Sequence, residues 1–247
     1  MAYEFLGTAA LVYAVNISHN MPFAVIGIAG TLWISIMFMG PVTGGHCNPA
    51  VTLGVLTVNK HAHKDLYMLS RILIAEFVGG IFGIFMAFFS LRNAGASGPL
   101  SELGVPSTAV AMLIPNKPLV SGWGGFQIEV IATFIFVFVI LIMKTQRTAP
   151  TGDGVLACGS ICLTLGAMCL VAGPHTGGGI NPAVGLAQTL WGVWNFGTAN
   201  PVHYQNLWLY VIGPSCGGVL AGFCMRMHVQ ATHYMLDPPG KSEPAEI

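Results

Sequence analysis

The sequence has very few charged residues. Only 7% of its 247 residues are Asp, Glu, Lys or Arg, whereas about a quarter is usual in a soluble globular protein. Nine basic residues balance nine acidic ones, so the chain lacks the basic excess that nucleic-acid binding needs. Since 54% of the residues are hydrophobic and 32 are Gly, without the alternation of a β-strand, the composition predicts an all-α integral membrane protein.

The chain also lacks the patterns of disulfide frameworks, metal sites and common enzymes. Its six Cys lie in or beside apolar stretches without CxxC spacing, which is typical of buried thiols. Its Gly-rich runs are not followed by the Lys-Ser/Thr of a phosphate-binding loop. We therefore expect no enzyme activity, no cofactor and no metal. No basic segment precedes the first apolar run, so a removable signal peptide is not expected.

Long apolar segments are abundant. A bilayer core needs about 20 mostly apolar residues per helix, and six stretches qualify: about 3–19, 22–41, 66–90, 124–143, 154–173 and 205–227. Two shorter apolar segments lie at about 48–58 and 181–191. About ten helical residues rise only about 15 Å, so these two segments are expected to be re-entrant or interfacial.

The basic residues predict the orientation. Six spans place both termini on one side, and the basic residues on that side are Lys60, Lys64, Arg71, Lys144, Arg147, Arg226 and Lys241. Only Arg92 and Lys117, in the 91–123 connection, fall opposite. The positive-inside rule therefore makes both termini cytoplasmic and the connection extracellular. We expect one transmembrane domain over 1–236 and a disordered cytoplasmic tail over 237–247.

An internal repeat is the most informative feature. Residues 40–51 read GPVTGGHCNPAV and residues 173–184 read GPHTGGGINPAV, with nine of twelve positions identical. Repeat 1 covers about 3–90 and repeat 2 about 124–227. Each repeat has three spans, an odd number, so the second must be inverted relative to the first. Short Gly/Pro-interrupted segments at matching places in inverted halves indicate a pathway near the bilayer midplane.

The repeated motif has a physical interpretation. Asn48 and Asn181 are expected to be helix N-caps, with Pro49 and Pro182 at the first helical position. Ala50 and Ala183 would keep the N-terminal ends of the two short helices close together. The partial positive charges of these helix ends would repel cations. The Asn amides would offer N–H donors to a passing oxygen. An extended, glycine-rich backbone before each Asn would turn its carbonyl groups toward the pore. The residues expected to contribute these carbonyl groups are Gly44, Gly45, His46, Cys47, Gly177, Gly179 and Ile180.

The sequence resembles the aquaporins, the major intrinsic protein family, from residue 3 to about 227. The resemblance rests on the EFLGT segment at 4–8, GGHCNPAVT at 44–52, Glu129 with Thr133, GGINPA at 178–183, and Gly213-Pro214 with Gly217-Gly218. It implies six tilted helices and two half-helices, assembled as a homotetramer in the lipid bilayer. Each subunit would have one pore for water or small neutral solutes.

The resemblance also implies a four-residue selectivity filter. Counted without gaps from the two Asn residues, its positions are Ile28, Cys169, Gly178 and Val184, where water-selective members typically resemble Phe, His, a small residue and Arg. An Arg in a narrow, dry constriction supplies donors and a cation barrier, and Val184 supplies neither. We therefore predict a wider, more apolar filter that passes water and some of glycerol, urea, ammonia or hydrogen peroxide.

Three carboxylates fall inside the predicted spans. Glu4 and Glu129 are expected to accept backbone N–H bonds from the re-entrant loops rather than to relay protons. Glu76, where the family usually has Gln, is expected to be a third brace. His46 is expected to brace its loop, with a pH-sensing gate as the alternative.

Two other functions remain open at this stage. An ion-coupled secondary transporter also uses inverted repeats and broken helices, but the central Asn48 and Asn181 are neutral. A structural junction protein on a nearly closed scaffold of this kind would tolerate the unusual Val184. Linear, unsaturable flux favours the channel, gradient-coupled uptake the transporter, and adhesion without permeability the junction protein.

Overall fold

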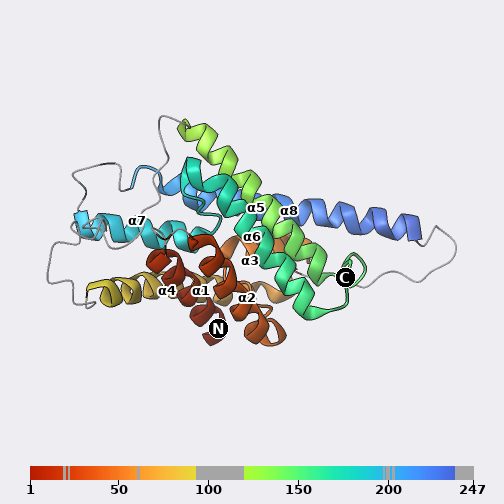
Figure 1. The fold of residues 1–247 in the computed structure, drawn as a ribbon. Helices are drawn as coiled ribbons and strands as arrows, with labels where there is room; N and C mark the ends of the chain where they lie inside the picture. The colour runs from red at the N-terminus through yellow and green to blue at the C-terminus, as the bar shows by residue number, and fades with distance from the viewer. Residues whose placement is uncertain are drawn as a thin grey trace.

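A computed structural model describes residues 1–18, 21, 23–59, 62–92, 120–196, 198, 201 and 204–236. Within these residues the chain is all-helical, as predicted. The eight helices are α1 (Ala2–Ser18), α2 (Ala24–Thr43), α3 (Pro49–Val58), α4 (Ala62–Arg92), α5 (Gly122–Lys144), α6 (Gly154–Thr176), α7 (Pro182–Phe196) and α8 (Leu207–Leu236). Figure 1 shows α7 extending to the left from the middle of the molecule, where α3 lies.

The long helices correspond to the predicted spans. Five of them are long and apolar enough to cross a membrane in the described part of the chain, namely α2, α4, α5, α6 and α8. The sixth predicted span is α1, which at 17 residues rises about 25 Å and packs along α4. Most of the 91–123 connection and the predicted tail at 237–247 lie outside the described residues.

The predicted ends of the last two helices were too early. Helix α7 runs to Phe196 instead of about 191, and α8 runs to Leu236 instead of about 227. The sequence from 223 to 236 contains neither Gly nor Pro, so nothing in it breaks the helix where the apolar run ends. The pair Pro238-Pro239 follows, and a proline disfavours helix in the residue before it.

The two short helices pack against the opposite halves of the chain. Helix α3 contacts α8, and α7 contacts α4. A Cβ on Gly218 would stand 2.1 Å from the carbonyl oxygen of Ala50, and a Cβ on Gly80 would stand 3.0 Å from that of Ala183. Glycine is therefore what lets a long helix of one half touch the first turn of the short helix of the other.

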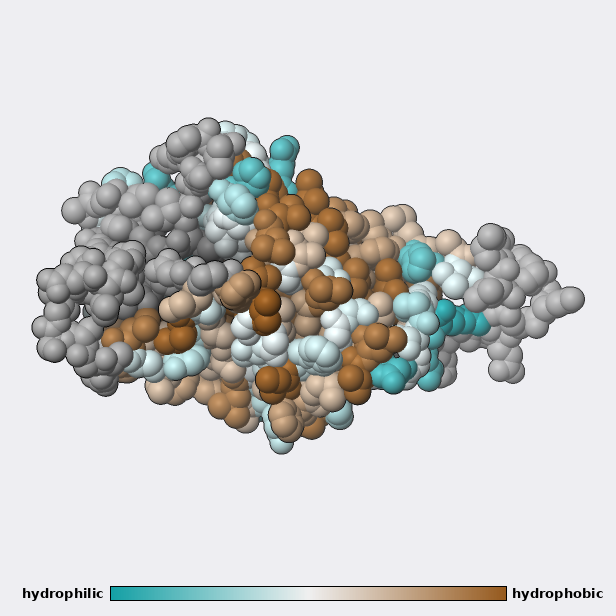
Figure 2. Space-filling model, in the orientation of Figure 1, coloured by the Kyte–Doolittle hydropathy of each residue, from teal (hydrophilic) through white to brown (hydrophobic). Residues whose placement is uncertain are grey.

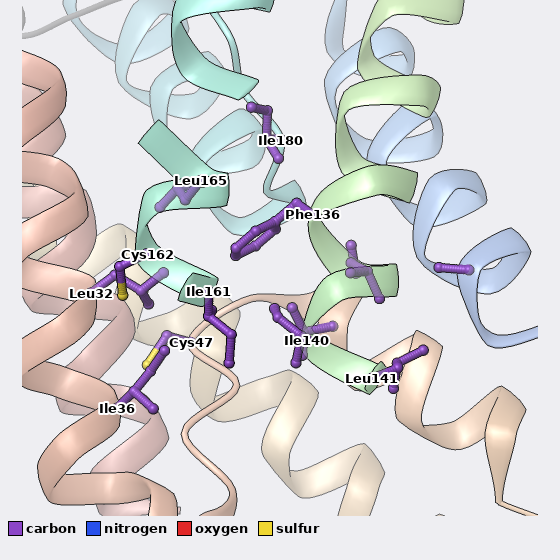
Figure 3. Packing of buried hydrophobic residues seen from close by; sticks show 14 of the residues in the cluster. Leu32, Ile36, Cys47, Phe136, Ile140, Leu141, Ile161, Cys162, Leu165 and Ile180 are labelled. Carbon is purple, nitrogen blue, oxygen red and sulfur yellow. The ribbon is translucent and has the colours of Figure 1, made fainter. Parts of the chain in front are cut away.

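Apolar side chains fill the interior and also cover the outside. Buried residues from α2, α5, α6 and the two loops form one cluster (Figure 3), which includes Leu32, Cys47, Phe136, Leu165 and Ile180. Large hydrophobic side chains are also widely exposed on the long helices, for example Ile26, Phe38, Leu163 and Leu170, and Figure 2 shows hydrophobic residues across the middle of the molecule. Such a surface is typical of contact with lipid or another subunit.

Candidate pore and selectivity site

The two loops that lead into α3 and α7 have the same unusual backbone. In each loop two glycines and one larger residue have positive φ angles, between 49° and 92°: Gly44, Gly45 and Cys47, and Gly177, Gly178 and Ile180. The loops are therefore left-handed at these positions and not extended, which corrects the sequence-based expectation. A left-handed Cys or Ile costs about 1–3 kcal/mol, so the surrounding contacts must hold each loop in this shape.

The Asn residues cap the short helices, as the motif predicted. Oδ1 of Asn48 accepts a hydrogen bond from Ala50 N at 2.9 Å, and Oδ1 of Asn181 accepts one from Ala183 N at 2.9 Å. The prolines stand at the first helical positions. Each cap satisfies one of the free N–H groups at a helix start.

The same two side chains also tie the loops together. Nδ2 of Asn48 donates to the carbonyl oxygen of Ile180 at 3.0 Å, and Nδ2 of Asn181 donates to the carbonyl oxygen of Cys47 at 3.0 Å. One of the two amide hydrogens of each side chain is therefore bonded within the protein. This reciprocal pair holds the N-termini of α3 and α7 against each other.

Glu4 and Glu129 hold the two loops from behind. Glu4 accepts hydrogen bonds from His46 N (3.1 Å), Cys47 N (2.8 Å) and the Thr43 hydroxyl (2.6 Å). Glu129 makes the same three contacts in the second half, and its donors are Gly179 N (2.9 Å), Ile180 N (2.7 Å) and the Thr176 hydroxyl (2.6 Å). Both carboxylates are fully buried. Their oxygens therefore satisfy the backbone donors of the strained segments.

Glu76 makes a third contact of this kind in the first half. Its Oε1 accepts from Asn48 N at 3.0 Å, and both of its oxygens lie within 3.0 Å of the Thr52 hydroxyl. The Thr52 hydroxyl also lies 2.9 Å from Nδ1 of His46. Thr52 has one hydroxyl proton, so when it donates to Glu76 it accepts from Nδ1–H of His46.

The four predicted filter residues surround one cavity. Its volume is about 330 Å³, and its lining includes Ile28, Cys169, Gly178 and Val184 together with His46, Asn48 and Asn181. Leu11, Val15, Ala24 and Val25 also line it. The cavity therefore lies toward the end of the bundle where α1 ends and α2 begins, opposite the N-terminus. Its lining contains no Lys, Arg, Asp or Glu among the described residues.

Sequence reasoning missed a buried amide pair beside this cavity. Nε2 of Gln188 donates to Oδ1 of Asn16 at 3.3 Å, and Nδ2 of Asn16 donates to the Val12 carbonyl oxygen at 2.7 Å. Gln188 lies one helical turn after Val184 and also lines the cavity. The sequence did show Asn16 and Gln188 as polar residues within apolar helices. No local pattern in the sequence indicates that these two residues contact each other.

These features define a class of protein. It is an all-helical, multi-pass membrane protein with two inverted halves. Each half contributes a short helix whose capped N-terminus lies at a common cavity.

The family follows from comparison with known proteins. The model of the major intrinsic protein family matches residues 1–225, and the chain belongs to this family. The chain is 29% identical over 229 residues to glycerol uptake facilitator protein-like 6 of Lactiplantibacillus plantarum, covering 91% of this chain and 95% of that protein. It is 32% identical over 237 residues to aquaporin Z of Rhodopseudomonas palustris, covering 91% and 90%.

A solved structure supports the same fold. The aquaglyceroporin from Plasmodium falciparum superposes with a TM-score of 0.77 at 22% identity, covering 94% of this chain and 96% of that one. At this identity the likeness establishes the fold alone. Family membership, relatives and architecture together make this chain a membrane channel for water and small neutral solutes.

Proposed function

We propose that the cavity is the wide part of a passive pore through each subunit and that Asn48 and Asn181 form its central constriction. The observation that carries this proposal is the reciprocal bonding of the two Asn amides to Ile180 and Cys47. It keeps two helix N-termini, and one free N–H of each amide, beside the same passage. A water or hydroxyl oxygen accepts from these donors, whereas the positive helix ends disfavour a cation.

The filter in this proposal is apolar. Ile28, Cys169, Gly178 and Val184 offer no fixed cation and little hydrogen bonding to a solute, so selection there depends on size and on the cost of shedding water. Small neutral solutes with an apolar face pay less for this step than ions do. The relative that is named as a glycerol uptake facilitator supports solutes larger than water. We therefore infer permeation by water and some of glycerol, urea, ammonia or hydrogen peroxide.

The exposed apolar helix faces support insertion in a bilayer and assembly with other copies. We infer assembly as a homotetramer. We also infer that both termini lie on the cytoplasmic side, since most basic residues of the sequence fall on that side of the predicted spans. Glu4, Glu76 and Glu129 act in this proposal as loop braces and carry no protons across.

A liposome permeability panel tests the function. Purified protein is reconstituted, and swelling is followed with water alone, glycerol, urea and ammonia. Fast, unsaturable flux of water and at least one solute is expected. Saturable uptake coupled to an ion gradient would replace the channel with a transporter, and vesicle adhesion without flux would replace it with a junction protein.

The filter assignment is tested by Val184→Arg. The added side chain narrows and charges the constriction, so the flux of the permeant solute should fall about tenfold or more relative to water. Val184→Ala is the matched control and should keep solute flux, because it adds neither bulk nor charge. Equal solute-to-water ratios in both variants, with both proteins monodisperse on gel filtration, would refute the filter assignment.

A further inference from the structure

Three side chains in the first half of the molecule form a hydrogen-bond relay that ends at the cavity. Both carboxylate oxygens of Glu76 lie within 3.0 Å of the Thr52 hydroxyl, and this hydroxyl lies 2.9 Å from Nδ1 of His46. Glu76 and Thr52 are fully buried, whereas His46 is 7% exposed and lines the cavity. The relay therefore connects a buried carboxyl group of α4 to the wall of the candidate pore.

The second ring nitrogen of His46 makes no hydrogen bond within the described part of the protein. Nε2 has no partner there, and it is not one of the enclosed, unpaired polar atoms of those residues. Because His46 lines the cavity, this nitrogen is available to a molecule in the passage. A neutral imidazole has one N–H and one lone pair. The position of the ring proton therefore decides whether the passage meets a hydrogen-bond acceptor or a donor.

An ionised Glu76 determines where that proton lies. A carboxylate only accepts hydrogen bonds, so the Thr52 hydroxyl gives its single proton to Glu76. The hydroxyl oxygen then accepts from Nδ1 of His46, which must carry the ring proton, and Nε2 keeps the lone pair. Asn48 N donates to Oε1 of Glu76 at 3.0 Å. This bond holds the carboxylate in the orientation that the relay needs.

A hydrogen atom on the Glu76 side of the relay reverses the arrangement. When the carboxyl group is protonated, or is replaced by an amide, it donates to the Thr52 hydroxyl. The Thr52 proton then turns to Nδ1 of His46, and the ring proton moves to Nε2. One change at a residue that does not line the cavity therefore exchanges an acceptor for a donor at the cavity wall.

Two charged residues of neighbouring helices face this relay. Glu4 and Lys144 both interact electrostatically with Glu76, and Lys144 also does so with His46. A Cβ on Gly44 would stand 2.9 Å from Nε2 of His46 and 3.7 Å from Nζ of Lys144. A positive charge beside the ring favours the tautomer that turns a lone pair toward it. The described residues of α3 and α7, which also pack on α4, include no charged side chain.

We propose that Glu76 is a positioning residue that sets the tautomer of His46 through Thr52, so that an acceptor nitrogen lines the passage and favours ammonia as a solute. The inference rests on the proposed function, because it requires that solutes pass His46. Ammonia has three N–H groups and one lone pair. It donates to Nε2 and keeps its lone pair for the Asn amides of the proposed constriction. Water has as many donors as acceptors and gains equally from either tautomer.

Nitrogen-15 NMR of histidine-labelled protein tests the relay, because protonated and unprotonated ring nitrogens have well-separated chemical shifts. His46→Gln identifies the His46 signals among those of the eight histidines. At alkaline pH the wild type should carry the His46 proton on Nδ1, and Glu76→Gln should carry it on Nε2. Thr52→Ser keeps the hydroxyl and should match the wild type. In Thr52→Val, which lacks the hydroxyl, adding Glu76→Gln should no longer move the proton.

Three NMR results would overturn the relay. The first is the same His46 tautomer in the wild type and in Glu76→Gln. The second is a wild-type ring that is protonated on Nε2, or on both nitrogens, at alkaline pH. The third is a proton shift caused by Glu76→Gln that persists in the Thr52→Val protein.

Solute flux in liposomes at the same pH tests the specificity. The ratio of ammonia flux to water flux should fall about fivefold in Glu76→Gln, the effect of one neutral hydrogen bond. Thr52→Ser is the matched control and should keep the wild-type ratio. An unchanged ratio in Glu76→Gln, despite a shifted tautomer, would overturn the role in specificity. A wild type without water swelling would instead refute the proposed function, whereas the NMR result on the relay would stand.

Discussion

At the residue scale, the site depends on polar groups that each satisfy a defined partner. The caps by Asn48 and Asn181 were predictable from sequence, because a cap and its N–H donor lie two residues apart. The reciprocal bonds to Ile180 and Cys47 were not, since they join residues more than 130 positions apart and depend on how the two halves meet. The same holds for the bond between Gln188 and Asn16.

The contacts of Glu129 and Glu76 predict unequal responses of these two carboxylates to amide substitution. In Glu129→Gln, the new NH₂ group faces Ile180 N–H or Gly179 N–H, so one buried donor loses its acceptor at a cost of about 1–3 kcal/mol. In Glu76→Gln, Oε1 still accepts from Asn48 N, and the NH₂ group donates to the Thr52 hydroxyl, which can turn its own proton to His46. This variant should be nearly neutral.

Thermal unfolding in detergent, followed by circular dichroism, measures both variants. Glu129→Gln should unfold at a clearly lower temperature than Glu76→Gln, and its water flux per protein should fall. Equal unfolding temperatures would mean that the contacts of Glu129 with its loop contribute little to stability.

At the element scale, helix positions were predicted well and helix contacts were not. Hydrophobic runs located the eight helices of the described residues, because each long helix must present an apolar surface to lipid. The run lengths failed for the end of α8, where a polar but unbroken sequence continues the helix to Leu236. The Gly217-Gly218 pair was noted in the sequence, but its role became clear only from the contact of Gly218 with Ala50.

Gly218→Ala should be the most damaging small substitution in the membrane region. Its Cβ would stand 2.1 Å from a backbone oxygen of α3, and backbone cannot yield as a flexible side chain would, so we expect a loss of about 3 kcal/mol. Gly30→Ala is the control, because a Cβ on Gly30 meets nothing within 4 Å.

The yield of monodisperse protein and its unfolding temperature report on both glycine variants. Gly30→Ala should match the wild type or exceed it slightly, since alanine favours helix. If Gly218→Ala were as stable as Gly30→Ala, the close approach of α8 to α3 would not limit the fold.

At the scale of the whole molecule, both halves of one chain contribute to the candidate pore. The described residues that line the cavity come from α1, α2 and the first loop and from α5, α6, α7 and the second loop. The inverted repeat predicted a pathway between the two halves, because an odd number of spans per half inverts the second half relative to the first. One pore per subunit was implied by the family resemblance and stays a prediction. The basic-residue pattern predicted an orientation, which stays a prediction.

Mixed assemblies test whether the subunits conduct independently. When wild-type chains are co-reconstituted with a non-conducting variant, water flux should fall in proportion to the variant fraction. Stopped-flow swelling at several mixing ratios measures this. A steeper, cooperative loss would mean that the permeation path is shared between subunits.

The reciprocal amide bonds also constrain how the protein is made. When the ribosome has added Asn48, the carbonyl group that its side chain will bind is still 132 residues from being synthesised. The first re-entrant segment therefore reaches its final, locked position only after the second half has been inserted. Neither half is expected to be stable when expressed alone, and the two should gain protection from hydrogen exchange together during biogenesis.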